Sequence, residues 1–517
     1  MDCKIRKAEL WLKHKLTPLK TIFMHSTSLP KFSKFPLRYN YSGWLLTISF
    51  IAMTFIPRSF DDALFVDGLA YASIARNMAI GLGTFWEPFF AESFWLAFND
   101  RCSFFCEHPP LMFGLQSLLF RILGDTTLVE NLYNAIVLIV TMFLIHLIWK
   151  KLFEDQPDFS EFSWLAVLFW YGFRIVWWSV PNNLLDTTMA AFCLASCYLQ
   201  LLAFSESKFN IVYWVSSSVM VALACLTKGP VGLFPIAFPL IYAVVFGKSF
   251  MQQAFIGVTV LVSVFSLILT LLLLYPPAQY FLSNYFQGQV MLALLQKREK
   301  ISNHWTAHLY LVKLLLVNII PHILILVTLF LNSLYGKFPT KFSLKIKKVG
   351  LLTLLTSLSI ILPMLASVKQ ADYYLMPAFP FIGLFFAATC VEMIYTLIRR
   401  LTIIPRLFLP VFSVFCIVIM GYKLLFPNPD TMFEIARNIS KYVPHHAKIY
   451  LPKKISLYSE IHTPFQRYSA LSIAFKQNET KYLYFDNPKD NTLDSLKRAG
   501  SCRIISLGND ATLAIAN

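Results

Sequence analysis

Acidic and basic residues recur in several separated segments of the chain, each at the edge of an apolar stretch. The acids come from two segments: Asp67 and Glu107 lie in the first, and Asp186 lies in the second. The cations Lys228, Arg298 and Lys369 come from three further segments. A carboxylate can act as general base on a sugar hydroxyl. Lysine and arginine can bind a phosphate and stabilise its charge as it leaves. Together these residue types indicate transfer of a group away from a phosphate, at a membrane surface if the leaving group is a lipid.

Each of these residues also has an ordinary structural interpretation. An aspartate at a helix start, such as Asp186, often only caps the helix. Lys228, at the end of an apolar stretch, can simply extend its amine toward water. His304 and His308 are typical of surface residues, and Arg76 is expected to cap or pair on its own helix. The functional interpretation depends on the segments gathering on one side of a membrane.

The composition is typical of an integral membrane protein with many spans. Among 517 residues, 57% are hydrophobic and 14% charged, against about 45–50% and about 25% in soluble chains. The mean hydropathy is +0.59. A soluble multidomain protein and an intrinsically disordered protein are both excluded. The net charge of +17 could suggest nucleic-acid binding, but in a membrane protein basic residues mark the cytoplasmic side, so no nucleic-acid partner is expected.

Apolar stretches of about 17–25 residues are long enough to cross the hydrocarbon core as helices. Eleven such stretches occur: 42–57, 130–149, 162–180, 186–204, 211–228, 230–247, 254–275, 309–331, 350–368, 373–396 and 407–426. Thirteen spans would result if 109–124 and one further stretch also crossed. The predicted fold class is therefore an all-α polytopic membrane protein with about eleven transmembrane helices.

The basic residues set the orientation of these spans. Segment 1–41 holds nine Lys or Arg against two acids, 332–349 holds five Lys, and 397–406 holds three Arg. With eleven spans, these clusters and Lys150–Lys151 all fall on the cytoplasmic side, as does the N-terminus. Segment 58–108, with three Arg against seven acids, then lies outside. All the candidate residues fall on this outer, periplasmic or extracytoplasmic face of the cell inner membrane.

Three parts of the chain are expected: a basic cytoplasmic segment 1–41, a transmembrane catalytic domain 42–426, and a soluble domain 427–517. The first outer loop, 58–129, contains two short helix-like stretches, 67–80 and 109–124. We expect these two helices to lie in the outer interface rather than to cross. In the same loop, Cys102 and Cys106 would pair in an oxidising compartment or remain as two free thiols.

Residues 427–517 differ from the rest of the chain. Hydrophobic runs there shorten to strand length, at Lys448–Leu451, Tyr482–Phe485 and Arg503–Leu507, and alternate with polar, helix-like segments. This alternation predicts a small α/β domain. It would lie on the outer side, since it follows the last span.

Several other chemistries lack their motifs. The sequence has no GxxxxGK[ST] nucleotide-binding loop, no HExxH or CxxC metal pair, and no GxSxG nucleophile motif. We therefore expect no required cofactor. A divalent metal bound by Glu107 and His304 is a weakly signalled alternative.

Five motifs follow one another along residues 60–380: Asp67 with Tyr71 and Ile74-Ala75-Arg76-Asn77-Met78, Glu107-His108-Pro109-Pro110-Leu111, Asn183-Leu184-Leu185-Asp186, Leu226-Thr227-Lys228-Gly229-Pro230-Val231-Gly232, and Lys369 with Tyr374-Leu375-Met376-Pro377-Ala378-Phe379-Pro380. In this order they resemble the membrane glycosyltransferases of the GT-C class. More closely, they resemble bacterial lipid A aminoarabinose transferases and dolichyl-phosphate-mannose protein mannosyltransferases. The second motif is similar to the Glu-Lys-Pro-Pro-Leu of these relatives.

The resemblance implies transfer of a sugar from a polyprenyl-phosphate carrier, at the outer face, to lipid A or another lipid, a glycan or a protein, with inversion at the anomeric carbon. It implies that Asp67 is the principal catalytic residue, with Asp186 and Glu107 as further candidates. The implied ligands of the donor phosphate are Lys228, Lys369, Arg298, Tyr71, Tyr374 and His108.

Two departures from the relatives fall on the donor-phosphate side. His108 replaces a lysine, and Ala70 stands where aminoarabinose transferases carry an arginine. Histidine is neutral for much of the time near pH 7, so the donor phosphate loses a permanent positive charge. The identity of the donor sugar is therefore not predicted. A flippase or transporter of lipid-linked saccharides and a scaffold of an envelope complex remain alternatives. A transporter would need charges at mid-span, where the main cations are Arg174 and Lys313.

Overall fold

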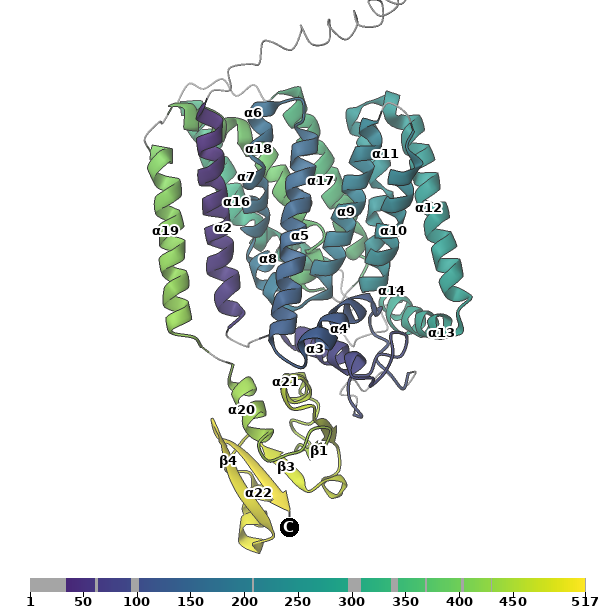
Figure 1. Ribbon diagram of the computed structural model, residues 1–517, viewed down its shortest axis with the longest axis vertical. Coiled ribbons are helices and arrows are strands. Elements are labelled where there is room, and N and C mark those ends of the chain that lie inside the picture. The colour runs from purple at the N-terminus through teal and green to yellow at the C-terminus, as the bar shows by residue number, and fades with distance from the viewer. Residues whose placement is uncertain are drawn as a thin grey trace, which may run out of the picture.

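The computed structural model describes residues 34–60, 64–93, 102–206, 209–295, 308–335, 343–367, 370–400, 404–428 and 430–516. It forms a bundle of long helices with a small sheet-containing domain at one end (Figure 1). Three of the candidate residues, Arg298, His304 and Lys369, lie outside the described residues.

The long helices of the bundle run between its two ends (Figure 1). They are α2 (Lys34–Arg58), α5 (Leu128–Leu152), α9 (Leu185–Ser205), α10 (Ile211–Lys228), α12 (Met251–Leu273), α16 (Tyr310–Tyr335), α17 (Leu344–Met364), α18 (Phe379–Arg400) and α19 (Ile404–Leu425). Shorter segments complete it: α6 (Pro157–Ser160), α7 (Ser163–Tyr171), α8 (Arg174–Ser179), η1 (Val180–Asn182), η2 (Pro230–Ile236), α11 (Phe238–Phe246), η3 (Lys248–Phe250), α13 (Pro276–Tyr285), η4 (Phe286–Met291), α14 (Leu292–Leu294) and η5 (Asp372–Leu375).

Within the described residues, eight helices are long and apolar enough to cross a membrane, which makes the chain an integral membrane protein. The other three predicted spans take different forms. The stretch 162–180 is divided into α7 and α8, because Phe173 adopts an extended backbone between them. The stretch 230–247 contains three prolines and is divided into η2 and α11. The stretch 42–57 lies within α2, which begins in the basic segment. The count of eleven spans stays a prediction.

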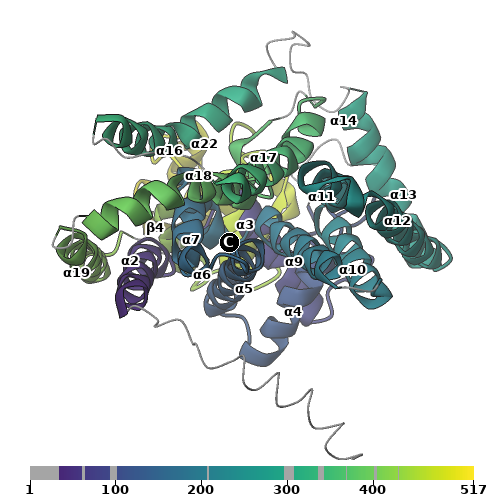
Figure 2. The same ribbon diagram turned by 90° about the horizontal axis from the view of Figure 1, so that it is seen from above.

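The centre of the bundle is an aromatic and aliphatic core. In the view from above, α5, α7, α9 and α18 lie centrally, and α12, α16 and α19 lie at the rim (Figure 2). Trp149, Trp170 and Phe379, from three of the central helices, are almost completely buried. The spanning windows of the rim helices are only 11% buried in α12 and α16 and 17% in α19. Their exposed apolar faces are suited to contact with lipid.

Basic helix ends gather at the end of the bundle away from the sheet domain. Lys150 Nζ, at the end of α5, lies 2.6 Å from Glu161 Oε1, and Asn40 of α2 also bonds this carboxylate. Lys345, at the start of α17, pairs with Asp155 at 2.9 Å. The basic clusters that were predicted to share one face therefore do lie near one another where they are described.

Two short helices lie at the opposite end of the bundle, beside the sheet domain (Figure 1). These helices are α3 (Val66–Ala79) and α4 (Leu111–Leu123), with 14 and 13 residues. Both are too short to cross about 30 Å of hydrocarbon. Between them Cys102 and Cys106 form a disulfide, which decides between the two states that the sequence allowed.

The C-terminal domain is a five-stranded mixed sheet with helices. Its strands are β1 (Lys448–Tyr450), β2 (Ser472–Ala474), β3 (Tyr482–Phe485), β4 (Cys502–Gly508) and β5 (Ala511–Ala516), in the order β2-β1-β3-β5-β4. Its helices are α20 (Thr431–Ile439), α21 (Ser459–Ser469), η6 (Gln477–Glu479) and α22 (Asn491–Ala499). Three of the strands were predicted. The short β2 and the last strand, β5, were not.

A buried histidine links this domain to the first outer loop and predicts an acid-sensitive interface. His462 of α21 lies 3.4 Å from Ser93 Oγ and against the ring of Phe90. Burial lowers the pKa of His462 to about 3, against about 6.5 in an unfolded chain. Below pH 6.5 the unfolded state therefore binds a proton that the folded state does not, and stability falls as the pH falls.

Between pH 7.5 and pH 5 this linkage removes about 2 kcal/mol of stability. Thermal unfolding of the purified protein at the two pH values measures it. We expect His462→Gln to reduce the pH dependence, while His445→Gln, at an exposed position, leaves it unchanged. An equal pH dependence in wild type and His462→Gln would contradict this assignment.

Candidate active site

The site is built where the start of α3 meets the turn before α9. Asn182 Oδ1 accepts a hydrogen bond from the backbone N–H of Phe65 at 2.8 Å. Asn183 adopts a left-handed backbone (φ 55°), and its side chain donates to the carbonyl of Gly68 at 3.0 Å. A Cβ atom at Gly68 would overlap the carbonyl oxygen of Asn182, so only glycine permits this approach. The contact places Asp67, in the first turn of α3, near Asp186, in the first turn of α9.

Asp186 and Lys228 form an ion pair between α9 and α10. Lys228 Nζ donates to Asp186 Oδ2, and the two side chains are 12% and 3% exposed. The N-cap of α9 is Leu184, so the carboxylate of Asp186 binds a lysine and does not cap its helix. Lys228 is correspondingly held inside the protein and does not merely extend toward water. A buried pair of this kind fixes the position of a cation at the end of α10.

The turn after Lys228 is also fixed. Gly229 has a φ of +89°, and a Cβ atom there would overlap Tyr285 Oη. This hydroxyl donates to the carbonyl of Lys228 at 3.2 Å. Tyr285 is the last residue of α13, so a helix of the bundle's outer edge supports the backbone of the lysine.

Two consecutive tyrosines of η5 cover the lysine and reach the first carboxylate. The ring centroids of Tyr374 and Tyr373 lie 4.5 and 5.5 Å from Lys228 Nζ, within the range of a cation–π interaction. The hydroxyl of Tyr373 donates to Asp67 Oδ2 at 3.4 Å. Burial, and next the charge of Asp67, raise the pKa of Tyr373 far above its ordinary value, so this hydroxyl keeps its proton.

Tyr71 lies one helical turn after Asp67, where the charges of both Asp67 and Asp186 act on it. It is 5% exposed. Burial raises the pKa of Tyr71 well above its ordinary value, and the charges of Asp67 and, more weakly, Asp186 add to the rise. On its other side the ring meets His108 edge-on, with centroids 5.8 Å apart. Tyr71 therefore keeps its proton, and its ring packs against His108.

The structure thus brings together six of the residues that the sequence singled out: Asp67, Tyr71, His108, Asp186, Lys228 and Tyr374. Glu107 is buried directly before His108, and its contribution stays a prediction. Three further candidates lie outside the described residues: Arg298, Lys369 and His304. The metal pair Glu107–His304 therefore stays a prediction. In the part of the chain that the structure describes, no cluster of three or more His, Cys, Asp or Glu is suited to a metal ion.

The sequence analysis did not predict the site contacts of four residues: Tyr373, Tyr285, Asn182 and Asn183. Tyr373 is adjacent to a selected tyrosine, so the Tyr-Tyr pair carried a usable signal. The left-handed Asn183 also carried one, because asparagine is the common non-glycine residue in that conformation. Tyr285 had no signal, since its partner lies 57 positions earlier in the chain.

An apolar cavity opens beside the lysine. Its volume is about 460 Å³. Segments α10, η2, α12, α13 and η4 line it, with Leu226, Gly229, Leu233, Leu269, Tyr285 and Phe286 among the lining residues. Because Gly229 and Tyr285 line the cavity and also hold the turn after Lys228, the cavity borders that turn.

The combination of a lipid-accessible helical bundle, clustered acids and a buried lysine defines the chain as a candidate membrane transferase, and comparison with known proteins specifies the fold. Residues 107–275 match the family described as dolichyl-phosphate-mannose-protein mannosyltransferase. No curated protein matches the sequence.

Two solved structures are similar over most of the chain. The first is ArnT from Cupriavidus metallidurans bound to undecaprenyl phosphate, with a TM-score of 0.60, 13% identity, and coverage of 91% of this chain and 97% of that one. The second is the apo oligosaccharyltransferase of Archaeoglobus fulgidus, with a TM-score of 0.54, 11% identity, and coverage of 89% and 70%. The chain therefore has the fold of GT-C membrane glycosyltransferases, as its motifs predicted.

Proposed function

We propose that the protein transfers a sugar from a polyprenyl-phosphate carrier to an acceptor hydroxyl or amide at the outer face of the membrane, with inversion at the anomeric carbon. The observation that carries the proposal is the half-buried carboxylate of Asp67, linked through Tyr373 to a cation, Lys228, that pairs with Asp186. A base and a phosphate ligand are the two groups that such a transfer needs.

The proposed reaction is a single displacement. Asp67 accepts the proton of the acceptor group, whose oxygen or nitrogen forms a bond to the anomeric carbon. The bond between that carbon and the phosphate oxygen breaks, and the electron pair leaves with the polyprenyl phosphate. Lys228 stabilises the charge of this leaving group, and the hydroxyl of Tyr373 orients the carboxylate of Asp67. The reaction as written needs no cofactor; a divalent metal bound through Glu107 and His304 stays an untested alternative.

The apolar cavity supports a lipid-linked donor. It borders the turn that follows Lys228 and is large enough for the first part of a polyprenyl chain. We propose that the phosphate of the carrier binds at Lys228. The similar ArnT structure holds undecaprenyl phosphate, which agrees with a carrier of this class. We propose Arg298, Lys369, Tyr71, Tyr374 and His108 as further ligands of the phosphate.

The site restricts the identity of the donor sugar and of the acceptor less than it restricts the type of reaction. Ala70, where some relatives carry arginine, is 3% exposed and packed among apolar side chains, so this position supplies no cation to the donor. A similar structure of the Archaeoglobus fulgidus enzyme holds a tethered acceptor peptide, so peptides join lipid A, other lipids and glycans as acceptor classes. We place the protein in the cell inner membrane, with the N-terminus in the cytoplasm and the site and C-terminal domain outside.

Mass spectrometry of envelope lipids, glycans and proteins from cells with and without the protein tests this function. The proposal predicts that one sugar mass disappears from one class of molecule when the protein is absent. The same sugar should return with wild type and fail to return with an Asp67→Asn variant. Identical envelope profiles in cells that express and lack the protein would contradict the proposal.

A further inference from the structure

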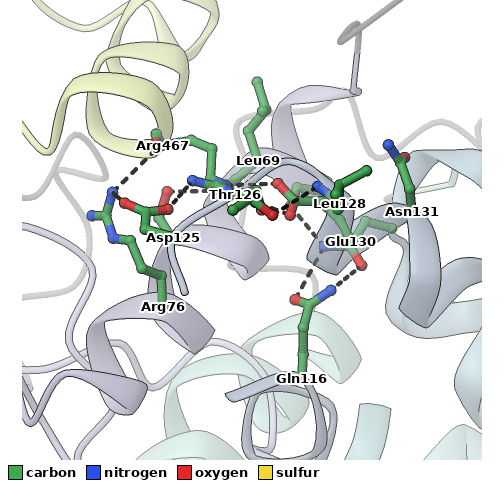
Figure 3. A network of polar contacts seen from close by, with 12 residues as sticks. Leu69, Arg76, Gln116, Asp125, Thr126, Leu128, Glu130, Asn131 and Arg467 are labelled. Carbon is green, nitrogen blue, oxygen red and sulfur yellow. Dashed lines mark hydrogen bonds and ion pairs between the residues drawn. The ribbon is translucent and has the colours of Figure 1, made fainter. Parts of the chain in front are cut away.

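The C-terminal domain inserts one arginine into the first outer loop. Arg467 of α21 is 3% exposed and lies between two acids (Figure 3). Its Nε and Nη2 donate to Glu130 at 2.6 and 3.1 Å, and its Nη1 donates to Asp125 at 2.6 Å. Nη2 also donates to the carbonyl of Thr126 at 2.9 Å. The guanidinium therefore uses its rigid fork on two carboxylates and the backbone.

A second buried arginine makes the return contact from α3. Arg76 is 3% exposed, and its Nη1 donates to the carbonyls of Gln466 and Arg467, at the end of α21, at 2.9 and 3.0 Å. It also lies 3.7 Å from Asp125 (Figure 3). As expected, Arg76 also pairs on its own helix, where its Nε and Nη2 donate to Asn77 Oδ1 at 3.1 and 2.8 Å. The contacts of Nη1 with the C-terminal domain were not expected. Cations at the C-terminal end of a helix are favoured by the helix dipole.

The four charged groups balance one another. Arg76 and Arg467 face Asp125 and Glu130, and Glu130 is 1% exposed. Removing Arg467 would leave the buried carboxylate of Glu130 without this cation, which is strongly unfavourable. This balanced and mostly buried set, in which only Asp125 is exposed at 44%, holds three segments in one arrangement: α3, the start of α5, and α21.

Helix α3 is consequently held at both ends. Its start packs on the turn around Asn182 and Asn183, and its end is held by Arg76 and the C-terminal domain. Asp67 and Arg76 are nine positions apart, or about 13 Å along a rigid helix. A displacement of the end of α3 therefore moves the candidate base at its start, and a misplacement of about 1 Å can cost about 100-fold in rate.

We propose that the C-terminal domain is a working part of the active site: Arg467 and Arg76 are positioning residues that hold α3 so that the carboxylate of Asp67 meets the acceptor. The C-terminal domain acts on the reaction through α3, the helix that carries Asp67, and need not bind the substrate. This inference rests on the proposed function, because it assigns the domain a role in that same transfer.

Kinetics of the full-length protein test the inference. We expect Arg467→Ala to lower kcat about 10- to 100-fold and to leave the KM for the polyprenyl-phosphate-sugar donor within about twofold, because the phosphate ligands are untouched. Arg467→Lys keeps the charge but not the fork, so we expect a smaller loss. If Arg467→Ala does not fold, the kinetics of Arg467→Lys test the inference in its place. Lys448→Ala, which removes only an exposed pair with Glu92 at the same interface, should keep wild-type kinetics.

A second background separates positioning from general loss of structure. In an Asp67→Glu variant the carboxylate is already displaced, so each Arg467 substitution should lower kcat less than threefold further. Hydrogen exchange should also rise in α3 and not in α9. An equal loss in both backgrounds, or wild-type kcat in the Arg467 variants, would overturn the inference. Absence of transfer by the wild-type protein in the same assay would instead refute the proposed function.

Discussion

Replacement of Asp67 by asparagine is expected to lower the rate of sugar transfer by about 100- to 10,000-fold, the range that general-base catalysis contributes. The amide cannot accept a proton from the acceptor. It keeps an oxygen for the hydrogen bond from Tyr373, and Asp67 is only half-buried, so the variant should fold. The measurement is the transfer rate of purified protein at matched folded concentration.

Asp372→Asn provides the matched control for this variant. Asp372 belongs to the same end of the bundle and pairs with the exposed Arg174 at 3.3 Å. We expect its transfer rate to stay within about threefold of wild type, because a pair with the exposed Arg174 contributes little. Asparagine also keeps an oxygen that can accept the backbone N–H of Tyr373. Full activity of Asp67→Asn would remove Asp67 as the base, and equal losses in both variants would point to general disruption of this face.

The second large effect concerns the ion pair of Lys228 and Asp186. Lys228→Met should abolish transfer and also destabilise the protein by about 3–5 kcal/mol, because it leaves the buried carboxylate of Asp186 without its cation. The double variant Lys228→Met/Asp186→Leu removes both charges. We expect it to recover most of the stability, since apolar side chains can replace a buried ion pair, and to remain inactive. Thermal unfolding and transfer rates of the three proteins measure the two effects separately.

Lys345→Met is the control for the ion-pair experiment. It removes a pair with Asp155 in which the side chains are 22% and 56% exposed, so we expect a change below about 1 kcal/mol and normal transfer. Recovery of transfer in the double variant would show that the cation at Lys228 is structural only. Undiminished stability of Lys228→Met would show that Asp186 does not depend on it.

The sequence was sufficient to predict that Asp67, Asp186 and Lys228 lie at the same end of the bundle. Asp67, Asp186 and Lys228 stand at helix ends, and the alternation of spans assigns each end to one side of the bundle. Their order along the chain matched motifs of a known class. The helix ends that carry basic clusters were assigned to the other side by the same argument, and their contacts agree where they are described.

The sequence was not sufficient where side chains meet across long separations or where a helix is interrupted. Arg467 contacts Glu130 over 337 positions, and no local pattern marks that pair. The break between α7 and α8 lies at Gly172-Phe173-Arg174 in a stretch that is otherwise mostly apolar, so mean hydropathy alone counts one span there. The contact of Tyr373 with Asp67 was not predicted, because the motif pointed to Tyr374 and the sequence does not show which of two adjacent rings turns toward a carboxylate.

The most direct test of the central claim is an assay in liposomes that contain the purified protein, an extracted polyprenyl-phosphate-sugar with a labelled sugar, and acceptor molecules from the envelope. We expect the label to move to an acceptor through a new glycosidic bond, with one free polyprenyl phosphate released per sugar, and we expect Asp67→Asn to stop both. Movement of the labelled lipid between leaflets with no glycosidic bond formed would contradict the account and favour a transporter.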